Sequence, residues 1–322
     1  MKGKISLAPM QGYTDWVFRE AYEKYISAID EYYSPYILLQ NDGSIKNSHR
    51  REVEPLSARG ALLVPQFMGG SSKECMPVVE YLTGLGYERL NWNLGCPFPM
   101  VAKRGRGSGL LAKPDIIRDI LDDLFSRSNI SLSVKVRLGY DNDLDIFEVL
   151  KIFNEFPLTE VIVHPRIGKQ LYKGGVNLDL FEQCLNESVH PVAYNGDLYT
   201  YADYQLINDR FPNITHCMIG RGVLQDLWLP HRIKGNTVPQ GKQALSLLKD
   251  FHNHLFHIYS ELLSGDTQLL MRMKPMWEYF SMHFANSKKV YKGIKKAHSL
   301  KNYDAAVNFA FQMGLKSDDT II

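Results

Sequence analysis

Short β-type runs alternate with amphipathic helical stretches along the first three quarters of the chain, and few folds accommodate this pattern. The runs are rich in branched and aromatic residues, and apolar residues recur at helical spacing between many of them. Strands that alternate with helices predict a parallel sheet, and eight such units are what a closed barrel requires. The expected strands are residues 5–9, 28–33, 62–68, 89–94, 131–138, 160–164, 191–195 and 216–220.

The pattern changes beyond residue 230, where residues 235–241 read as a linker containing glycine and proline. We therefore predict an α/β fold in which a (β/α)8 TIM barrel over residues 1–238 precedes an all-α helical domain over residues 239–322. An open doubly wound sheet is the weaker alternative, because Met10-Gln11-Gly12, rather than a Gly-x-Gly-x-x-Gly turn, follows the first strand. Helices are expected in the second domain over residues 242–263, 267–284 and 304–313.

Composition narrows the class of protein. A chain of 322 residues with 45% hydrophobic content can bury a full core. Its four cysteines include no Cys-x-x-Cys pair, which argues against a disulfide framework or a zinc site and suits a reducing compartment. No extended apolar leader begins the chain, and no run is long enough to span a membrane. We expect a soluble, cytoplasmic, monomeric protein with no metal and no membrane contact.

Positive charge is concentrated near the carboxyl end. Residues 240–322 contain 11 Lys and Arg against 7 Asp and Glu, although the whole chain has a net charge of only +2. Such a cluster is the footprint that a polyanion would use, and a solvated helix face explains it equally well. The lysines concerned are Lys288, Lys289, Lys292, Lys295, Lys296 and Lys301.

Cys96 lies where chemistry is expected. It belongs to Asn93-Leu94-Gly95-Cys96-Pro97, in which a glycine turns the chain after a predicted strand and a proline fixes the backbone. The glycine-rich residues 105–111 follow and would let the backbone approach a ligand. A buried, inert thiol is the alternative. That interpretation fits the other three cysteines better, because they lie in or beside helical or strand patterns: Cys75, Cys184 and Cys217.

Every predicted strand ends near a polar or otherwise special residue. In a barrel of this kind the groups that perform chemistry lie at the carboxyl ends of the strands. One such residue has an ordinary structural explanation, but eight sets together predict an active site. In chain order the sets are Met10 with Gln11, Glu31, Gln66, Asn93 with Cys96, Lys135 with Arg137, His164 with Arg166, Asn195 with Asp197, and Gly220 with Arg221.

Two of these strand ends indicate a phosphate site. Asn195-Gly196-Asp197 and Gly220-Arg221-Gly222 follow the seventh and eighth predicted strands, where barrels commonly bind a phosphate. Arg221 can bind a phosphate with two parallel hydrogen bonds. Lys135 and Gln66 would suit an electron-rich ring such as the N1–C2 region of a flavin. A Schiff-base aldolase with Lys135 as nucleophile is the competing chemistry, and it would leave Cys96 unexplained.

Five segments together resemble the motifs of the flavin-dependent tRNA dihydrouridine synthases, in that family's order and spacing. A sixth, residues 272–277, resembles the family's helical domain. The sequence departs from the family where Asn91 replaces a frequent Asp, Met100 a common Lys, and Pro165 and Ile167 a frequent Gly and Thr. The five segments are residues 7–15, 93–97, 133–139, 195–197 and 218–222.

The resemblance implies a barrel that binds FMN, reduced by NADPH or NADH, and a helical domain that helps to hold tRNA. It makes Cys96 the proton donor and Asn93 a residue that orients the target uracil. The isoalloxazine would contact Pro9, Met10, Gln11, Gln66, Lys135 and His164. The ribityl chain and phosphate would contact Asn195, Gly196, Asp197, Gly220 and Arg221. Candidate RNA contacts are Arg137, Arg166, Arg272 and Lys274.

The resulting hypothesis is reduction of the C5–C6 double bond of a D-loop uridine in tRNA to 5,6-dihydrouridine. One alternative is a flavin barrel that reduces a free pyrimidine or another small unsaturated molecule, which would not need a basic helical domain. A second is an RNA-binding protein whose barrel has lost catalysis. The Cys96, Lys135 and Asn195-Gly196-Asp197 set argues against the second alternative.

Overall fold

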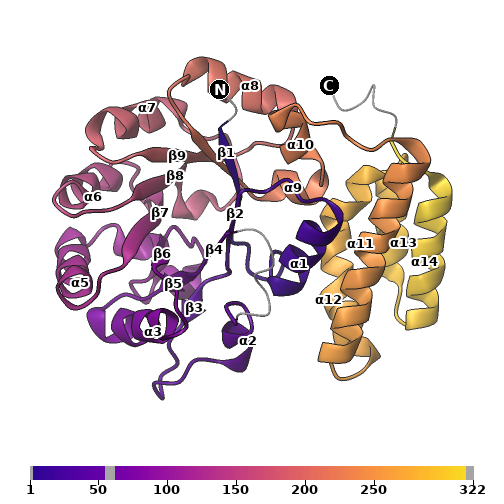
Figure 1. Ribbon diagram of the computed structural model, residues 1–322, viewed down its shortest axis with the longest axis horizontal. Coiled ribbons are helices and arrows are strands. Elements are labelled where there is room, and N and C mark those ends of the chain that lie inside the picture. The colour runs from indigo at the N-terminus through magenta and orange to yellow at the C-terminus, as the bar shows by residue number, and fades with distance from the viewer. Residues whose placement is uncertain (1–2, 55–61, 317–322) are drawn as a thin grey trace.

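A computed structural model describes residues 3–54 and 62–316 of the chain (Figure 1). Its strand segments all run parallel within one sheet. They are β1 (Lys4–Leu7), β2 (Glu31–Tyr33), β3 (Ile37–Leu38), β4 (Leu62–Val64), β5 (Gln66–Met68), β6 (Arg89–Leu94), β7 (Ser131–Gly139), β8 (Glu160–Ile167), β9 (Val192–Asn195) and β10 (His216–Ile219). Their order in the sheet is β3-β5-β6-β7-β8-β9-β10-β1-β2-β4.

The barrel closes through a strand that is interrupted at Pro65. Pro65 has no N–H to donate, so the stretch divides into β4 before it and β5 after it. β4 pairs with β2 on one side, and β5 pairs with β6 on the other. The Pro65 carbonyl accepts the Asn91 N–H at 2.9 Å. The two ends of the strand order therefore meet, and the predicted eight-stranded (β/α)8 barrel is confirmed, with β3 as a short addition beside β5.

β7 shows how the sequence builds this barrel. Along its alternating pattern Leu132, Val134 and Val136 are buried in the main core, under the helices. Lys135 and Arg137 alternate with these residues in sequence and point to the opposite side, into the barrel. A separate apolar layer fills the barrel interior and consists of Ala8, Tyr33, Val64, Ile162, Ala193 and Met218.

Helices surround the strands and cover their outer faces (Figure 1). They begin where the sequence supplies suitable residues: Pro114 occupies the first turn of α5, and the Thr200 side chain caps α8. The α-helices are α1 (Trp16–Tyr25), α2 (Asn47–Arg50), α3 (Ser72–Gly84), α4 (Pro99–Ala102), α5 (Pro114–Arg127), α6 (Asp145–Phe153), α7 (Leu178–Glu187), α8 (Tyr201–Arg210), α9 (Arg221–Gln225) and α10 (Leu229–Lys234). Short 3-10 turns are η2 (Gly107–Leu110) and η3 (Gly168–Gln170).

Four further helices stand together beside the barrel (Figure 1). They are α11 (Gly241–Leu262), α12 (Asp266–Phe280), α13 (Ser287–Lys296) and α14 (Leu300–Met313), with the turn η4 (Ser281–His283) after α12. Tyr303 links α14 to α11 and α12, since its hydroxyl lies 2.9 Å from His252 Nε2 and accepts the Trp277 indole N–H at 2.8 Å. Phe18 of α1 packs edge-on against Phe251 of α11, with ring centroids 5.5 Å apart. The division into domains at residue 238 stays a prediction.

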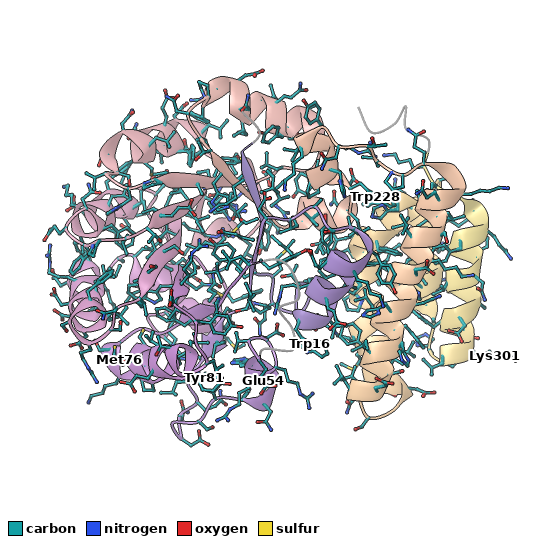
Figure 2. All side chains as sticks on the ribbon, in the orientation of Figure 1. Trp16, Glu54, Met76, Tyr81, Trp228 and Lys301 are labelled. Atoms are coloured by element: carbon teal, nitrogen blue, oxygen red, sulfur yellow. The ribbon has the colours of Figure 1, made fainter. Side chains whose placement is uncertain are left out.

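α13 falls between two of the helical ranges expected from the sequence, and its N-terminus is capped by the Asn286 side chain. Five of the clustered lysines lie exposed on this helix, while its Val290 and Ile294 are buried. Lys301, on α14, lies at the outer edge of the helical region (Figure 2). No helix in residues 3–54 and 62–316 is long and apolar enough to cross a membrane.

One strand position was wrong. The sequence pattern predicts a strand over residues 28–33, with Glu31 near its carboxyl end, but β2 begins at Glu31. Ser27 has a positive φ of 55°, so the chain is still turning toward the strand just before this point. Glu31 therefore lies at the amino ends of the strands, where it pairs with Lys4 and Arg89.

Candidate active site

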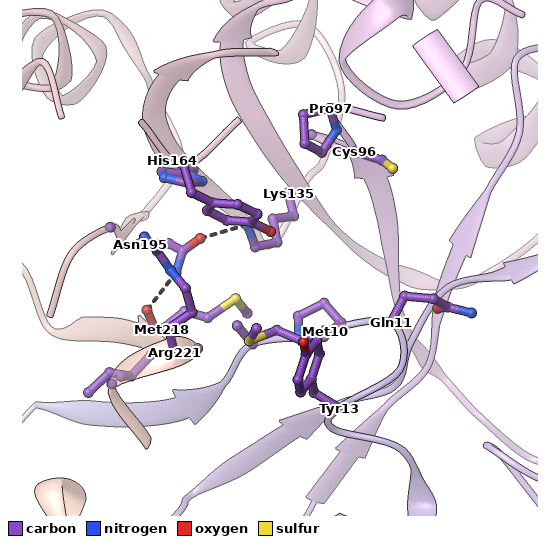
Figure 3. Close-up of a pocket in the computed structure, with 18 of the residues that line it drawn as sticks. Met10, Gln11, Tyr13, Cys96, Pro97, Lys135, His164, Asn195, Met218 and Arg221 are labelled. Atoms are coloured by element: carbon purple, nitrogen blue, oxygen red, sulfur yellow. Dashed lines mark hydrogen bonds between the residues drawn. The ribbon is translucent and has the colours of Figure 1, made fainter. Parts of the chain in front are cut away.

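A cavity of about 310 Å³ opens at the carboxyl ends of the barrel strands. The structure brings most of the sequence-predicted site residues to its walls, and Figure 3 shows side chains from several strands facing this space. The predicted residues that line the cavity are Pro9, Met10, Gln11, Asn93, Cys96, Lys135, Arg137, His164, Asn195, Gly196, Asp197, Gly220 and Arg221.

The Cys96 loop is held from both sides. The Asn93 side-chain oxygen accepts the backbone N–H groups of Gly95 at 3.1 Å and Cys96 at 2.9 Å. On the other side the Ser108 hydroxyl donates to the Cys96 carbonyl at 2.9 Å. Gly107 has a φ of +55°, and a Cβ there would lie 2.8 Å from the Cβ of Cys96. The glycine-rich segment therefore permits the close backbone approach that fixes the position of the cysteine.

Cys96 is suited to donate a proton. Burial raises the pKa of its thiol, and the Phe98 backbone N–H, Arg137 and the Tyr36 hydroxyl oppose this rise without cancelling it. The group is therefore a protonated thiol at neutral pH rather than a thiolate nucleophile. Burial and the neighbouring Cys96 also raise the pKa of Tyr36, to about 12, so Tyr36 keeps its proton.

Lys135 faces the cavity from β7. Its ammonium group donates to the Asn195 side-chain oxygen at 2.7 Å, and the Asn195 amide donates to the Met218 carbonyl at 2.8 Å (Figure 3). Burial and the nearby charge of Arg137 lower the pKa of Lys135 to about 7. An anion in the cavity would raise this pKa again, so the position is prepared for a negatively charged ligand.

Positive charge exceeds negative charge in this part of the barrel. Asp197 is the single carboxylate among the described residues that line the cavity, and it pairs with both Arg221, at 2.9 Å, and Arg166. Burial and the surrounding cations, Arg137 first among them, hold the pKa of His164 well below its usual value. His164 is therefore neutral, and the uncompensated cations favour an anionic group.

Several aromatic residues at the cavity were missed by the sequence analysis. Tyr172 and Tyr199 lie against the Arg221 guanidinium, whose carbon is 4.5 Å and 5.1 Å from their ring centroids. Tyr279 comes from α12 and meets Tyr13 edge-on at 5.3 Å. Tyr13 follows a polar strand end directly and could have been found there, whereas no spacing rule connects Tyr279 with the barrel.

Four predicted residues do not line the cavity. Gln66 is fully buried, accepts from the Asn93 amide at 2.7 Å and donates to Asn91 at 2.7 Å, so it supports the Cys96 loop from behind. Arg166 is buried beside Asp197. The remaining two, Arg272 and Lys274, form hydrogen bonds within the protein.

Arg272 and Lys274, the predicted RNA contacts on α12, make these internal bonds. The Arg272 guanidinium donates to the Gly12 carbonyl and the Tyr259 hydroxyl, both at 2.6 Å, and pairs with Asp15. Lys274 donates to the Ala297 carbonyl at 2.8 Å. Arg272 thus ties α12 to the loop after β1, and any RNA contact by these two residues stays a prediction.

Comparison with known proteins gives the family. The family model "Dihydrouridine synthase (Dus)" matches residues 6–313. The tRNA-dihydrouridine synthase B of Pasteurella multocida is 28% identical over 71% of this chain and 68% of its own length. The tRNA-dihydrouridine(16) synthase of Cupriavidus necator is 24% identical over 81% of this chain and 83% of its own.

Solved structures show the same architecture. The old yellow enzyme from Trypanosoma cruzi superposes with a TM-score of 0.52 over 74% of this chain and 89% of its own, at 7% identity. A morphinone reductase mutant gives 0.51 over 77% of this chain and 90% of its own, at 9% identity. At such identity the likeness concerns the barrel fold. The family model, by contrast, matches nearly the whole described chain, and this protein belongs to the dihydrouridine synthase family.

Proposed function

We propose that this protein is a flavin-dependent tRNA-dihydrouridine synthase, which uses NADPH or NADH to reduce the C5–C6 double bond of a D-loop uridine. The observation that carries the proposal is the position of Cys96, a protonated thiol held rigidly at the wall of a cation-rich cavity. A family of this activity and a pocket with both a proton donor and an anion-binding end support the same conclusion.

The residues present fit FMN as the cofactor. Its phosphate would lie against Arg221 and offset part of the charge by which Lys135, Arg137 and Arg221 exceed Asp197 at the cavity. We assign the ring contacts to Pro9, Met10, Gln11, Lys135 and His164, with Gln66 behind them. We assign the ribityl and phosphate contacts to Asn195, Gly196, Asp197, Gly220 and Arg221.

The chain's own residues then divide the work of the reaction. When bound, the flavin supplies the hydride chemistry. Cys96 donates the proton that completes saturation at C5 of the uracil, and Asn93, fixed by its bonds to the Cys96 loop, orients the base. Lys135 would stabilise negative charge on the flavin ring, and Arg137, which also lines the cavity, stabilises negative charge that builds on the uracil ring. The target base must leave its stack to reach these groups.

The proposed partner is tRNA, bound by a monomeric, cytoplasmic enzyme that needs no metal. The lysines exposed on α13 supply long-range attraction, and Arg137, Arg166, Arg272 and Lys274 are the further RNA contacts that we propose. In the described residues no group of three or more His, Cys, Asp or Glu is placed to hold a metal ion. The helical region from residue 239 onward would act as the tRNA-binding domain.

An anaerobic spectroscopic experiment tests the function. The purified protein is reduced with NADPH until its flavin absorbance is bleached, and tRNA lacking dihydrouridine is then added. Recovery of the oxidised spectrum, with dihydrouridine found in the tRNA, is the expected result. Recovery with free uracil but not with tRNA would favour the small-molecule reductase, and a colourless protein that binds tRNA would favour the non-catalytic alternative.

A further inference from the structure

The segment that follows Cys96 carries apolar side chains into solvent at the mouth of the cavity. Phe98 lines the cavity and is 52% exposed, and Met100, two residues on, is 82% exposed. Pro97 and Pro99 flank Phe98 and restrict its backbone on both sides. A rigid, exposed aromatic ring at the edge of a binding cavity costs hydration free energy in the free protein, which a bound partner would recover.

The same segment carries two unpaired cations. Lys103 and Arg104 are exposed at the end of α4, and neither forms an ion pair with any residue that the structure describes. Phe98, Met100, Lys103 and Arg104 form what we call the cavity rim. Aromatic or apolar surface beside free cations matches a nucleic acid strand, whose bases stack while its phosphates pair with Lys and Arg. The position of the rim at the mouth of the cavity that would receive the uracil favours RNA over a protein or lipid partner.

We propose that the cavity rim binds the nucleotides that flank the target uridine in the substrate RNA. Phe98 and Met100 pack against a neighbouring base, and Lys103 and Arg104 pair with the adjacent phosphates. The proposal rests on the proposed function and deepens it, because it assigns a subsite for the RNA around the reacting base.

Geometry explains why the flanking nucleotides need such a surface. A uridine that enters the cavity leaves its neighbours with one face unstacked, at a cost of a few kcal/mol per step. Those neighbours remain at the cavity mouth, because the phosphodiester chain joins them directly to the inserted nucleotide. Phe98 lies within two residues of Cys96 and contributes to the cavity wall, so its exposed ring is within reach of the adjacent base.

The main test compares Phe98→Ala with the wild-type enzyme on tRNA that lacks dihydrouridine. Losing one base-aromatic stack should raise KM for tRNA by about 5- to 100-fold. The rate of flavin reduction by NADPH should stay unchanged, and Phe98→Tyr should restore KM. Leu206→Ala is the matched control, because Leu206 is 70% exposed on α8 and does not line the cavity. Flavin content and thermal denaturation confirm that each variant is folded.

Salt dependence separates the two parts of the rim. Replacing both Lys103 and Arg104 with Gln should flatten the plot of log affinity against log salt by about 1 for each lost cation. Phe98→Ala should weaken binding and leave that slope unchanged, because stacking releases no counterions. Equal slopes in the double variant and the wild type would show that these cations do not contact phosphate, and would overturn the assignment.

The outcomes distinguish this inference from the function beneath it. If tRNA fails to reoxidise the wild-type flavin, the proposed function is wrong. If the wild type modifies tRNA while Phe98→Ala keeps its KM, the function stands and the rim does not hold the flanking base. A slower NADPH reaction in Phe98→Ala, with KM for tRNA unchanged, would place the nicotinamide rather than RNA against Phe98 and would also overturn the proposal.

Discussion

At the amino ends of the barrel strands the Ser6 hydroxyl lies 2.7 Å from His216 Nε2, and His216 Nδ1 lies 2.8 Å from Glu160. At the carboxyl ends Cys96 and Lys135 face an open cavity, and the Lys135 ammonium bonds to the Asn195 side-chain oxygen at 2.7 Å rather than to a carboxylate. Judged by distances alone, the first set resembles the nucleophile, base and orienting carboxylate of a hydrolase. Judged by its surroundings, the second set is the one that can bind a ligand and react with it.

Access and charge balance separate the two ends. Ser6 has no exposed surface, and the ion pairs around it are matched: Glu31 lies 3.0 Å from Lys4 and 2.8 Å from Arg89. Burial would raise the pKa of Glu31, but these two cations outweigh burial and lower it. At the carboxyl ends the cations exceed the single carboxylate of the cavity wall. A ligand can bind where the protein leaves both space and charge unfilled.

The largest expected effect comes from a substitution at the carboxyl ends of the strands, which we call the open end. Cys96→Ala should lower the rate of tRNA reduction by about 10²- to 10⁴-fold, because it removes the proton donor. Flavin binding and reduction by NADPH should persist, as measured by stopped-flow absorbance. Cys184→Ala, which alters a buried thiol on α7 away from the cavity, is the control. A wild-type turnover rate in Cys96→Ala would remove Cys96 from the mechanism.

A substitution at the amino ends of the strands, which we call the closed end, should affect stability instead. Glu31→Gln leaves Lys4 and Arg89 without their carboxylate and should lower the free energy of unfolding by about 1–3 kcal/mol, measured by urea denaturation. Its kcat and KM at a permissive temperature should match the wild type. Glu148→Gln breaks an exposed pair with Lys151 and should cost less than about 0.5 kcal/mol. Lost activity at unchanged stability would contradict the structural role of Glu31.

Per unit of pH, a smaller effect should appear in the stability of the flavin-free protein. The pKa of Lys135 is about 7 when folded and about 10.4 when unfolded, so the unfolded state binds more protons between these values. Stability should therefore rise with pH in this window, by at most about 1.4 kcal/mol per unit. Lys135→Met should remove that rise. Parallel stability curves for the variant and the wild type from pH 7 to 10 would show that Lys135 is not depressed.

The smallest expected effect is none at all. A fluorophosphonate probe, which labels accessible activated serines, should not react with Ser6, and Ser6→Ala should keep full tRNA reduction. Intact-mass analysis of the folded protein measures the labelling. A covalent adduct on Ser6 would mean that the closed end opens in solution and would remove the distinction drawn between the two ends.

The sequence was a better guide to the carboxyl ends of the strands than to the amino ends. The sequence pointed to Lys135 and Arg137 through their position near a strand end, and in the structure both line the cavity, because residues two apart on a strand share a face. Gly95 and Pro97 marked the loop of Cys96 through their backbone preferences. Glu31 was assigned to the wrong end, because the start of a short strand depends on pairing partners that are distant in sequence, here Leu62 of β4 and Ser6 of β1.

Long-range contacts also account for what was missed. Arg166 and Asp197 follow different strands, and only the closed barrel places them together. Gln66 has the residue type of a ligand contact, yet its amide is used between Asn91 and Asn93. Tyr279 reaches the cavity from a helix that follows the last strand by many residues. Sequence patterns of period 2 or 3.6 describe one strand or helix at a time and contain no information on contacts between different elements.

The contribution of Tyr279 to the cavity wall has a consequence for the order in which the protein is made. Chains emerge from the ribosome with the amino end first, and the barrel strands are complete well before α12 is synthesised. Until then the cavity lacks the part of its wall that Tyr279 supplies, and Tyr13 lacks its ring partner. Completion of the cavity wall is therefore a late step in the synthesis of this protein. A nascent barrel released early would leave the ribosome without the part of the wall that Tyr279 supplies.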